Sequence, residues 1–243
     1  MNTVLSLIYE IVFDALRDDA SRAIACYVVA HPEAVTTMSV QKLADACYVS
    51  TGTVLKFCQM LGIASFSAFK KSLKTTIATR RIQLEEKYRL LSKDDLSAKL
   101  NAFTPDAAQL ARSAKTVARI VARQKAIHLY GAAFPMALSL SFAEDCCILG
   151  YPVTFHSRFD PKEEIEGVHV LVTFSGRWIE SDYEACAKIS RFYQNFVLVT
   201  SSQRTLPNVL EKVQLPMLAS TEYMNIVYLL FLDLVLFELM HLQ

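Results

Sequence analysis

Apolar residues recur with the 3.6-residue period of an amphipathic helix through most of the first ninety residues. The predicted helices cover residues 2–17, 20–30, 39–47, 50–61 and 66–91. His31-Pro32 ends the second helix, because the residue before a proline avoids the helical region. Ser39 and Ser50 suit the N-caps of the third and fourth helices, and Gly62 is a C-terminal stop. The first third of the chain is therefore predicted to be all-α.

The pattern changes after residue 104. Thr104-Pro105 is predicted to be an N-cap followed by a proline at the first helical position, opening a helix to Arg123. Short β-prone runs follow at residues 126–130, 153–156, 168–174, 196–200 and 212–215. Helical stretches around 135–149, 180–193 and 220–242 separate most of them. Strands that alternate with helices predict an α/β fold, an αβα sandwich with a five-stranded parallel sheet.

Two apolar stripes in residues 39–62 lie close together in the sequence. Val40, Leu43, Ala44 and Cys47 form the first, and Val54, Phe57, Cys58 and Leu61 form the second. Only Tyr48, Val49 and the capping Ser50 join the two helices, so they are expected to cross sharply as in a helix-turn-helix. An ordinary pair of core helices is the alternative. The candidate DNA-binding residues are Ser39, Ser50, Thr51, Thr53, Lys56, Gln59 and Lys70.

Charge is unevenly distributed although the whole chain carries a net +1. Residues 1–92 hold 11 Lys/Arg against 8 Asp/Glu, whereas residues 93–243 hold 14 against 16. No acidic residue stands between Asp45 and Glu85, a stretch with six Lys or Arg. Such an excess suits either a polyanion or a solvated basic face.

The stretch SVQKLADACYVSTGTVLKFCQMLGIASFSAFKKSL resembles the N-terminal helix-turn-helix of RpiR-type bacterial regulators. The matching positions are Leu43-Ala44, Ser50, Thr53-Val54, Phe57, Leu61-Gly62, Phe66 and Phe69-Lys70. Lys56 departs from the family pattern, where an arginine is usual, and so does Tyr48, at a turn position that often holds glycine. A positive φ at Tyr48 would cost roughly 1 kcal/mol. The resemblance implies transcriptional regulation, with double-stranded DNA as the partner.

RpiR-type regulators join this domain to a SIS (sugar isomerase) domain that senses phosphorylated sugars, and the second half of the chain resembles that domain in layout. KAIHLYGAA and VHVLVTFSGRWIES stand where its two phosphate-binding loops belong. The ligand-binding residues that the resemblance implies are Gly131, Ala133, Thr173, Ser175, Gly176 and Arg177. Ala133 replaces a family glycine, Pro135 a serine and Trp178 a threonine, so hydroxyl donors are missing. Three interpretations stay open: a phosphosugar site, a site for another ligand, or a domain that only dimerises.

Catalytic and metal-binding patterns are weak in this sequence. There is no Walker A loop or nucleophile elbow, and His156 and His169 have no companion at metal-ligand spacing. We therefore predict no catalytic residue, no metal and no cofactor, with a phosphosugar isomerase-like enzyme as the alternative. The six cysteines form no Cys-x-x-Cys pair, which suits free thiols in a reducing cytoplasm.

The ends of the chain bear on localisation and assembly. The N-terminus lacks the basic region of a signal peptide. Residues 224–242 are long and apolar, but Asp233 and Glu238 favour a buried helix over a membrane span. Tyr223, Tyr228, Phe231 and Phe237 on that helix are the expected dimer interface, in a homodimer or a dimer of dimers. The predicted domains are a helix-turn-helix domain (1–80), a helical linker (81–104) and a SIS-like sensing and dimerisation domain (105–243).

Overall fold

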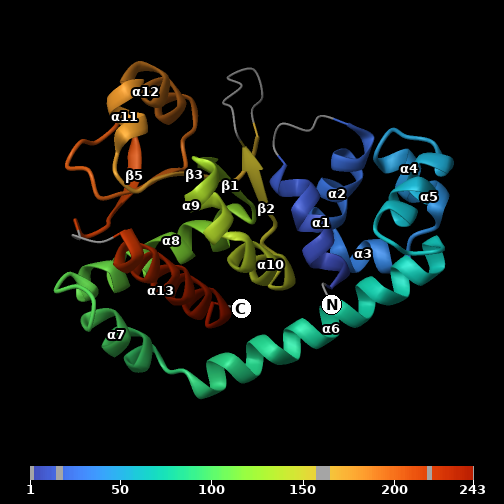
Figure 1. Cartoon of the computed structure of the whole chain (residues 1–243), viewed down its shortest axis with the longest axis horizontal. Coiled ribbons are helices and arrows are strands. Elements are labelled where there is room, and N and C mark those ends of the chain that lie inside the picture. Colours follow the sequence, from blue (N-terminus) through green and yellow to red (C-terminus); the bar gives the residue numbers. More distant parts are fainter. Residues whose placement is uncertain (1–2, 15–18, 157–164, 218–220, 243) are drawn as a thin grey trace.

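Helices alone make up the first part of the chain, and helices alternating with strands make up the rest, as the apolar periods predict (Figure 1). The computed structural model describes residues 3–14, 19–156, 165–217 and 221–242. The first part comprises α1 (Val4–Phe13), α2 (Ala20–Ala30), α3 (Pro32–Thr37), α4 (Val40–Ala46), α5 (Thr51–Met60) and α6 (Phe66–Leu90). We call α1 to α5 the head.

The second part begins with α7 and continues as an α/β domain. Its elements are α7 (Lys93–Asn101), α8 (Ala107–Gln124), β1 (Ile127–Gly131), α9 (Ala133–Leu138), α10 (Leu140–Ile148), β2 (Val153–His156), β3 (Val168–Thr173), α11 (Arg177–Ser181), α12 (Tyr183–Phe192), β4 (Phe196–Thr200), β5 (Val209–Gln214) and α13 (Thr221–Met240). We call α8 to α13 the α/β domain. All five predicted strands are present, with shifts of one to three residues at some ends.

Three helix starts differ from the sequence prediction. Pro32 does not only end a helix: it also stands at the first position of α3. Ser92 and Asp95 form a capping box that begins α7, a separate helix within the predicted helical linker (81–104) whose start was not predicted. The predicted N-cap Thr104 is wrong, because α8 begins at Ala107 with Asp106 as its cap. The Thr104 hydroxyl instead accepts a hydrogen bond from the Asp106 backbone N–H at 3.1 Å.

The sheet is parallel throughout, with strand order β2-β1-β3-β4-β5. α8, α10 and α13 cover one face, on which valines such as Val170 and Val197 meet Phe231 of α13. α11 and α12 lie on the other face, against Leu171 and Leu198. This arrangement confirms the predicted αβα sandwich. It also places β1 and β3 at the point where the strand order reverses, outside whose carboxyl ends open α/β sheets bind ligands.

α6 runs along the molecule from the head to the α/β domain (Figure 1). It continues without a break through residue 80, the predicted end of the first domain. Arg80 of α6 pairs with Asp145 of α10 at 2.6 Å, and Lys87 pairs with Asp233 of α13 at 2.6 Å. Lys93, at the start of α7, pairs with Glu238 of α13. Ion pairs therefore fasten this long helix to the α/β domain, while the domain boundaries stay a prediction.

α13 is long and apolar enough to cross a membrane by length and composition, yet half of its apolar window is buried in the protein. Its carboxylates Asp233 and Glu238 are the groups paired with Lys87 and Lys93. The predicted dimer interface is wrong in part. Tyr228 and Phe231 are buried in the core of their own chain, Phe237 packs against that core, and Tyr223 is exposed. A helix pattern shows an apolar side but does not reveal which neighbour covers it.

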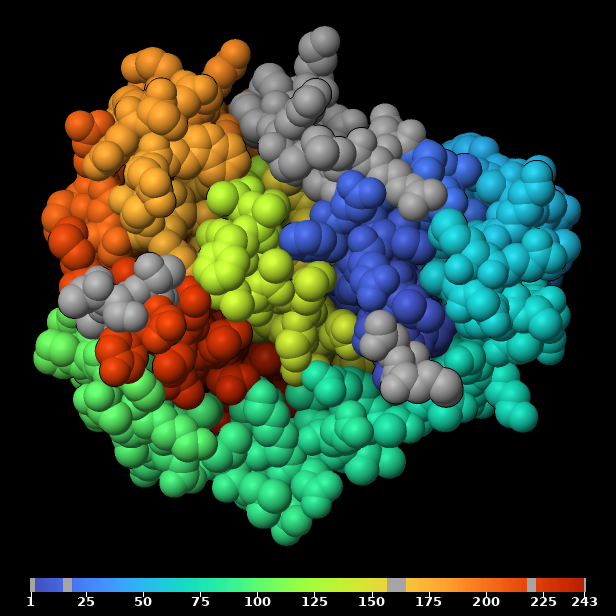
Figure 2. Space-filling model, viewed as in Figure 1, coloured from blue at the N-terminus to red at the C-terminus, as the bar shows by residue number. Residues whose placement is uncertain are grey.

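The head packs against the edge of the sheet. Figure 2 shows α1 and α2 lying against the segments that contain α9 and α10, with α4 and α5 at the far end of the molecule. Arg22 of α2 donates a hydrogen bond from Nη2 to the Phe155 carbonyl of edge strand β2 at 3.0 Å, and Phe13 packs edge-on against the Phe155 ring. One hydrophobic core runs through both parts. An edge strand that would otherwise be open to pairing is thereby covered.

Candidate nucleic-acid interface and ligand site

α4 and α5 are joined by a tight Schellman turn. The Val49 N–H donates to the Ala44 carbonyl and the Tyr48 N–H to the Asp45 carbonyl, which is the hydrogen-bond pair of that motif. Tyr48 stands at its left-handed position with φ +55°, and its side chain is 97% exposed. α5 ends in the same motif, with Gly62 at φ +76°. The two turns are alike except that one carries tyrosine where the other carries glycine.

The N-termini of α4 and α5 are capped by the two predicted serines. The Ser39 hydroxyl accepts from the Lys42 N–H at 3.2 Å, and the Ser50 hydroxyl accepts from the Thr53 N–H at 3.1 Å. Ser50 and Thr53 also share a hydrogen bond between their hydroxyls at 2.9 Å. Val54, Phe57 and Cys58 of α5 are buried, which confirms the predicted apolar stripe. The stripe fixes which side of α5 faces outward.

The outward side of α5 carries the polar residues that the sequence analysis selected. Lys56 and Gln59 are exposed, Thr51 is half-buried, and Gly52 leaves the backbone open near the N-terminus. The positive end of the helix dipole, short polar side chains and one lysine therefore share one surface. Such a surface suits base edges and phosphates.

The basic stretch that follows α5 has several roles. The Lys70 ammonium donates to the Met38 carbonyl at 2.9 Å and lies over the Phe66 ring, so it holds α3 against α6. Arg80 and Arg81 form ion pairs with Asp145 and Glu33. Lys71 and Lys74 are exposed. Part of the basic charge thus stabilises the fold, and only the rest is available to a partner. The sequence alone does not separate these two groups of residues.

The second candidate site lies at the carboxyl ends of β1 and β3. Gly131 ends β1, and a Cβ there would lie 2.6 Å from the Val172 carbonyl oxygen of β3. Gly176 has φ +71°, and a Cβ there would lie 2.3 Å from Cβ of Ser202. Both glycines are required by close approaches of the chain. Their presence therefore has a packing reason that is independent of any ligand.

The remaining groups at these strand ends differ in accessibility. Ser175 is exposed, and its hydroxyl accepts from Nε of Arg177 at 3.1 Å. Thr173 is buried, while Ala133 is exposed at the start of α9. Pro135, in the first turn of α9, has no N–H, so that turn has one fewer backbone hydrogen-bond donor for an anion. The structure thus brings Gly131 and Thr173–Arg177 to one end of the sheet, with Ser175 and Arg177 as the accessible polar groups.

Three histidines from three different strands meet on the sheet face that carries α12. Strand register places His128 beside both Thr154 and His169, and His156 beside Tyr130. Nδ1 of His128 lies 3.2 Å from Nε2 of His156, and the His169 ring stacks on Tyr193 with centroids 3.4 Å apart. Burial, and after it the neighbouring His128, lowers the pKa of His156 to about 3 and that of His169 to about 4.

The ring nitrogens of these histidines have hydrogen-bond partners within the protein. Nε2 of His128 lies 3.0 Å from the Glu166 carbonyl, Nε2 of His169 lies 2.9 Å from the Ile165 carbonyl, and the Tyr130 hydroxyl meets Nδ1 of His169. Within the described residues, no set of three His, Cys, Asp or Glu side chains could hold a metal ion. All six cysteines belong to the described part and are free thiols, as predicted. The histidines therefore pack the sheet face as neutral rings.

Comparison with known proteins finds a family match for the helix-turn-helix region. Residues 16–80 match the model of the helix-turn-helix domain of the rpiR family. An uncharacterised HTH-type transcriptional regulator of Caldanaerobacter subterraneus subsp. tengcongensis is 31% identical over 98 residues, which are 40% of this chain. The match spans 33% of that relative's length. The match with the family model confirms the resemblance that the sequence motifs indicated.

Two solved structures resemble the fold more distantly. The Vibrio vulnificus NanR protein complexed with ManNAc-6P is 16% identical, with a TM-score of 0.45 over 96% of this chain and 91% of that one. A hypothetical protein of Methanococcus jannaschii, inferred to be a 3-hexulose-6-phosphate isomerase, is 20% identical, with a TM-score of 0.47 over 62% and 90%.

Proposed function

Because residues 16–80 match the helix-turn-helix domain of the rpiR family, we propose that this chain is a cytoplasmic transcriptional regulator that binds double-stranded DNA through α4 and α5. The observation that carries the proposal is the outward face of α5, where Thr51, Lys56 and Gln59 stand beside a serine-capped N-terminus. Ser39 and Ser50 cap the N-termini of α4 and α5, and the positive end of a helix dipole suits a DNA phosphate. The chain is proposed to have no enzymatic activity.

Each candidate residue has a separate proposed role. Thr51 and Gln59 contact base edges, since both are polar and lie on the outward face of α5. Lys56 contacts a phosphate as a point charge. Thr53 supports the cap of α5 through its bond with Ser50, and Lys70 holds α3 in place, so both act on DNA indirectly.

Affinity for duplex DNA and its salt dependence test this proposal. Lys56→Ala should weaken binding to every duplex and reduce the slope of log K against log salt by about 1, because one released counterion is lost. Lys115→Ala on α8 is the matched control, since Lys115 is exposed and lies outside the head. Equal losses of DNA affinity in Lys56→Ala and Lys115→Ala would overturn the proposed role of α5. Thr53→Ala is a poorer test, because it also loosens the Ser50 cap.

For the α/β domain we propose an effector site at the carboxyl ends of β1 and β3. The reversal of strand order there supports the location, and Ser175 with Arg177 supplies a hydroxyl and a guanidinium for an anionic group. A phosphorylated sugar is the proposed effector, with Gly131, Ala133, Thr173 and Gly176 shaping the site. The protein is proposed to act as a homodimer, since helix-turn-helix regulators commonly bind paired half-sites.

Thermal stability in the presence of a phosphosugar panel tests the effector site. At least one phosphosugar should raise the Tm of the wild type, and Arg177→Gln should reduce the shift. A panel without any shift would leave dimerisation as the role of this domain. Turnover of a phosphosugar would instead favour the isomerase alternative.

A further inference from the structure

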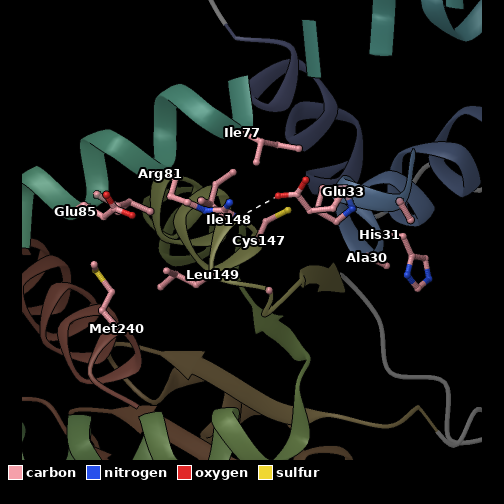
Figure 3. A pocket seen from close by; sticks show the side chains of 14 residues that line it. Ala30, His31, Glu33, Ile77, Arg81, Glu85, Cys147, Ile148, Leu149 and Met240 are labelled. Atoms are coloured by element: carbon pink, nitrogen blue, oxygen red, sulfur yellow. Dashed lines mark hydrogen bonds and ion pairs between the residues drawn. The ribbon is translucent and has the colours of Figure 1, made fainter. Parts of the chain in front are cut away.

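A cavity of about 500 Å³ lies between the head, α6 and the α/β domain (Figure 3). Residues 30–34, where α2 meets α3, form one side, and α6 forms another with Ile77, Arg81, Leu84 and Glu85. The C-terminal end of α10, at residues 147–150, and Met240 of α13 complete it. None of the proposed effector-site residues lines it, so the cavity is separate from the carboxyl ends of β1 and β3.

The cavity depends on the head being docked against the α/β domain. Sγ of Cys147, on α10, donates to the Val29 carbonyl of α2 at 3.3 Å, which joins two of its sides. Nη2 of Arg81 on α6 pairs with Oε1 of Glu33 on α3 at 3.0 Å, and Figure 3 shows this pair among the lining side chains. Elements of both parts are therefore needed to form the cavity. Ligand sites occur preferentially at such junctions, in cavities of roughly 300–1,000 Å³.

The lining indicates which ligands would fit. Ile77, Leu84, Ile148, Leu149 and Met240 supply an apolar wall. The charged lining residues are two carboxylates, Glu33 and Glu85, and one guanidinium, Arg81. Arg81 is already paired with Glu33. The C-terminal end of α10 adds partial negative charge from its last carbonyls. The cavity therefore combines an apolar surface with a net negative charge.

We propose that this cavity binds a small amphipathic cation, an amine carried on an aromatic or aliphatic body. The ammonium pairs with Glu85 at the rim, and the body lies against Leu84, Ile148 and Leu149. Such a ligand binds only the docked arrangement, so it stabilises the contact between the head and the α/β domain. An effect on DNA affinity rests on the proposed function, whereas binding itself does not.

Calorimetry and thermal unfolding of the full chain with three probes of one shape test the proposal. 2-Phenylethylamine supplies the cation, 2-phenylethanol the neutral analogue and 3-phenylpropionate the anion. The amine should bind most tightly and should raise the Tm. Glu85→Gln should weaken amine binding about three- to fivefold, the scale of an exposed ion pair, and leave 2-phenylethanol unaffected. Glu86→Gln, an exposed neighbour on α6 outside the lining, is the matched control and should change nothing.

A second variant separates this cavity from other places where an amine could bind. Ala34 lies in the lining and is exposed, so Ala34→Trp fills space without displacing core side chains. Ala34→Trp should abolish amine binding, and circular dichroism should show that the variant is still folded. Amine binding that survives both Glu85→Gln and Ala34→Trp overturns the proposal, as does stronger binding of the anion or no binding of any probe. These measurements contain no DNA, so their outcome is independent of the proposed function.

Discussion

Tyr48 offers a substitution that should stabilise the protein. It occupies the left-handed position of the Schellman turn between α4 and α5, where an L-residue with a Cβ is strained by about 1–2 kcal/mol. Replacement by glycine removes the strain but adds roughly 0.5–1 kcal/mol of backbone entropy to the unfolded chain. The side chain is 97% exposed, so its removal gives up almost no packing. Tyr48→Gly should therefore raise the free energy of unfolding by about 0.5–1 kcal/mol.

Two controls separate backbone strain from the loss of the tyrosine ring. Tyr48→Ala removes the ring but keeps a Cβ at positive φ, so it should leave stability nearly unchanged. Gly62→Ala makes the opposite change in the matching turn, where a new Cβ meets no atom within 4 Å, and should destabilise the protein by about 1 kcal/mol. The denaturant midpoints of the three variants report these changes in stability. The Tm of Tyr48→Gly should rise by about 1–4 °C. Destabilisation by Tyr48→Gly, or equal stabilisation by Tyr48→Ala, would refute the strain argument.

Three further predictions concern the α/β domain and its contact with α6. Because the pKa values of His156 and His169 fall to about 3 and about 4 in the folded protein, the unfolded chain binds more protons below the ordinary histidine pKa of about 6.5. The contribution of these neutral histidines to stability is complete above that pH and is lost as the pH falls toward 3–4. His156→Phe should flatten this part of the Tm-against-pH curve. An unchanged curve would contradict the assignment of this pH dependence to His156. Arg80→Met leaves the buried Asp145 carboxylate without its guanidinium and should cost about 3 kcal/mol in urea unfolding, whereas Arg81→Met, at an exposed pair, should cost less than about 1 kcal/mol. Gly131→Ala should lower the free energy of unfolding by more than about 2 kcal/mol, because the new Cβ meets the Val172 carbonyl oxygen at 2.6 Å. An unchanged free energy of unfolding would show that β1 and β3 can separate there.

Elements with a strong local signal could be predicted from the sequence. The α2 bounds follow from its apolar face and His31-Pro32, and the N-caps of α4 and α5 follow from Ser39 and Ser50. The five strands follow from runs of apolar residues that parallel strands need on both faces. The linker was predicted to be helical, but the separate start of α7 was not predicted, although Ser92 and Asp95 have the spacing of a capping box.

Other features depend on partners far away in the chain. The sequence shows that α13 is apolar, but only the fold shows that Tyr228 and Phe231 face their own core. His128, His156 and His169 meet because of strand register, which sequence spacing does not specify. The cavity beside Glu85 arises where the head, α6, α10 and α13 meet. The candidate residues of α5 could be selected from the sequence because one helix carries them all.

Selection of preferred duplexes from a random DNA pool tests the central claim, that α5 reads DNA, most directly. The wild type should enrich a defined sequence. Gln59→Ala should lose preference at one or two base positions, with a cost of about 1–3 kcal/mol at each, while Lys56→Ala weakens binding to all sequences alike. Gln59→Ala with an unchanged sequence preference, or a wild type that enriches no sequence at all, would contradict the account.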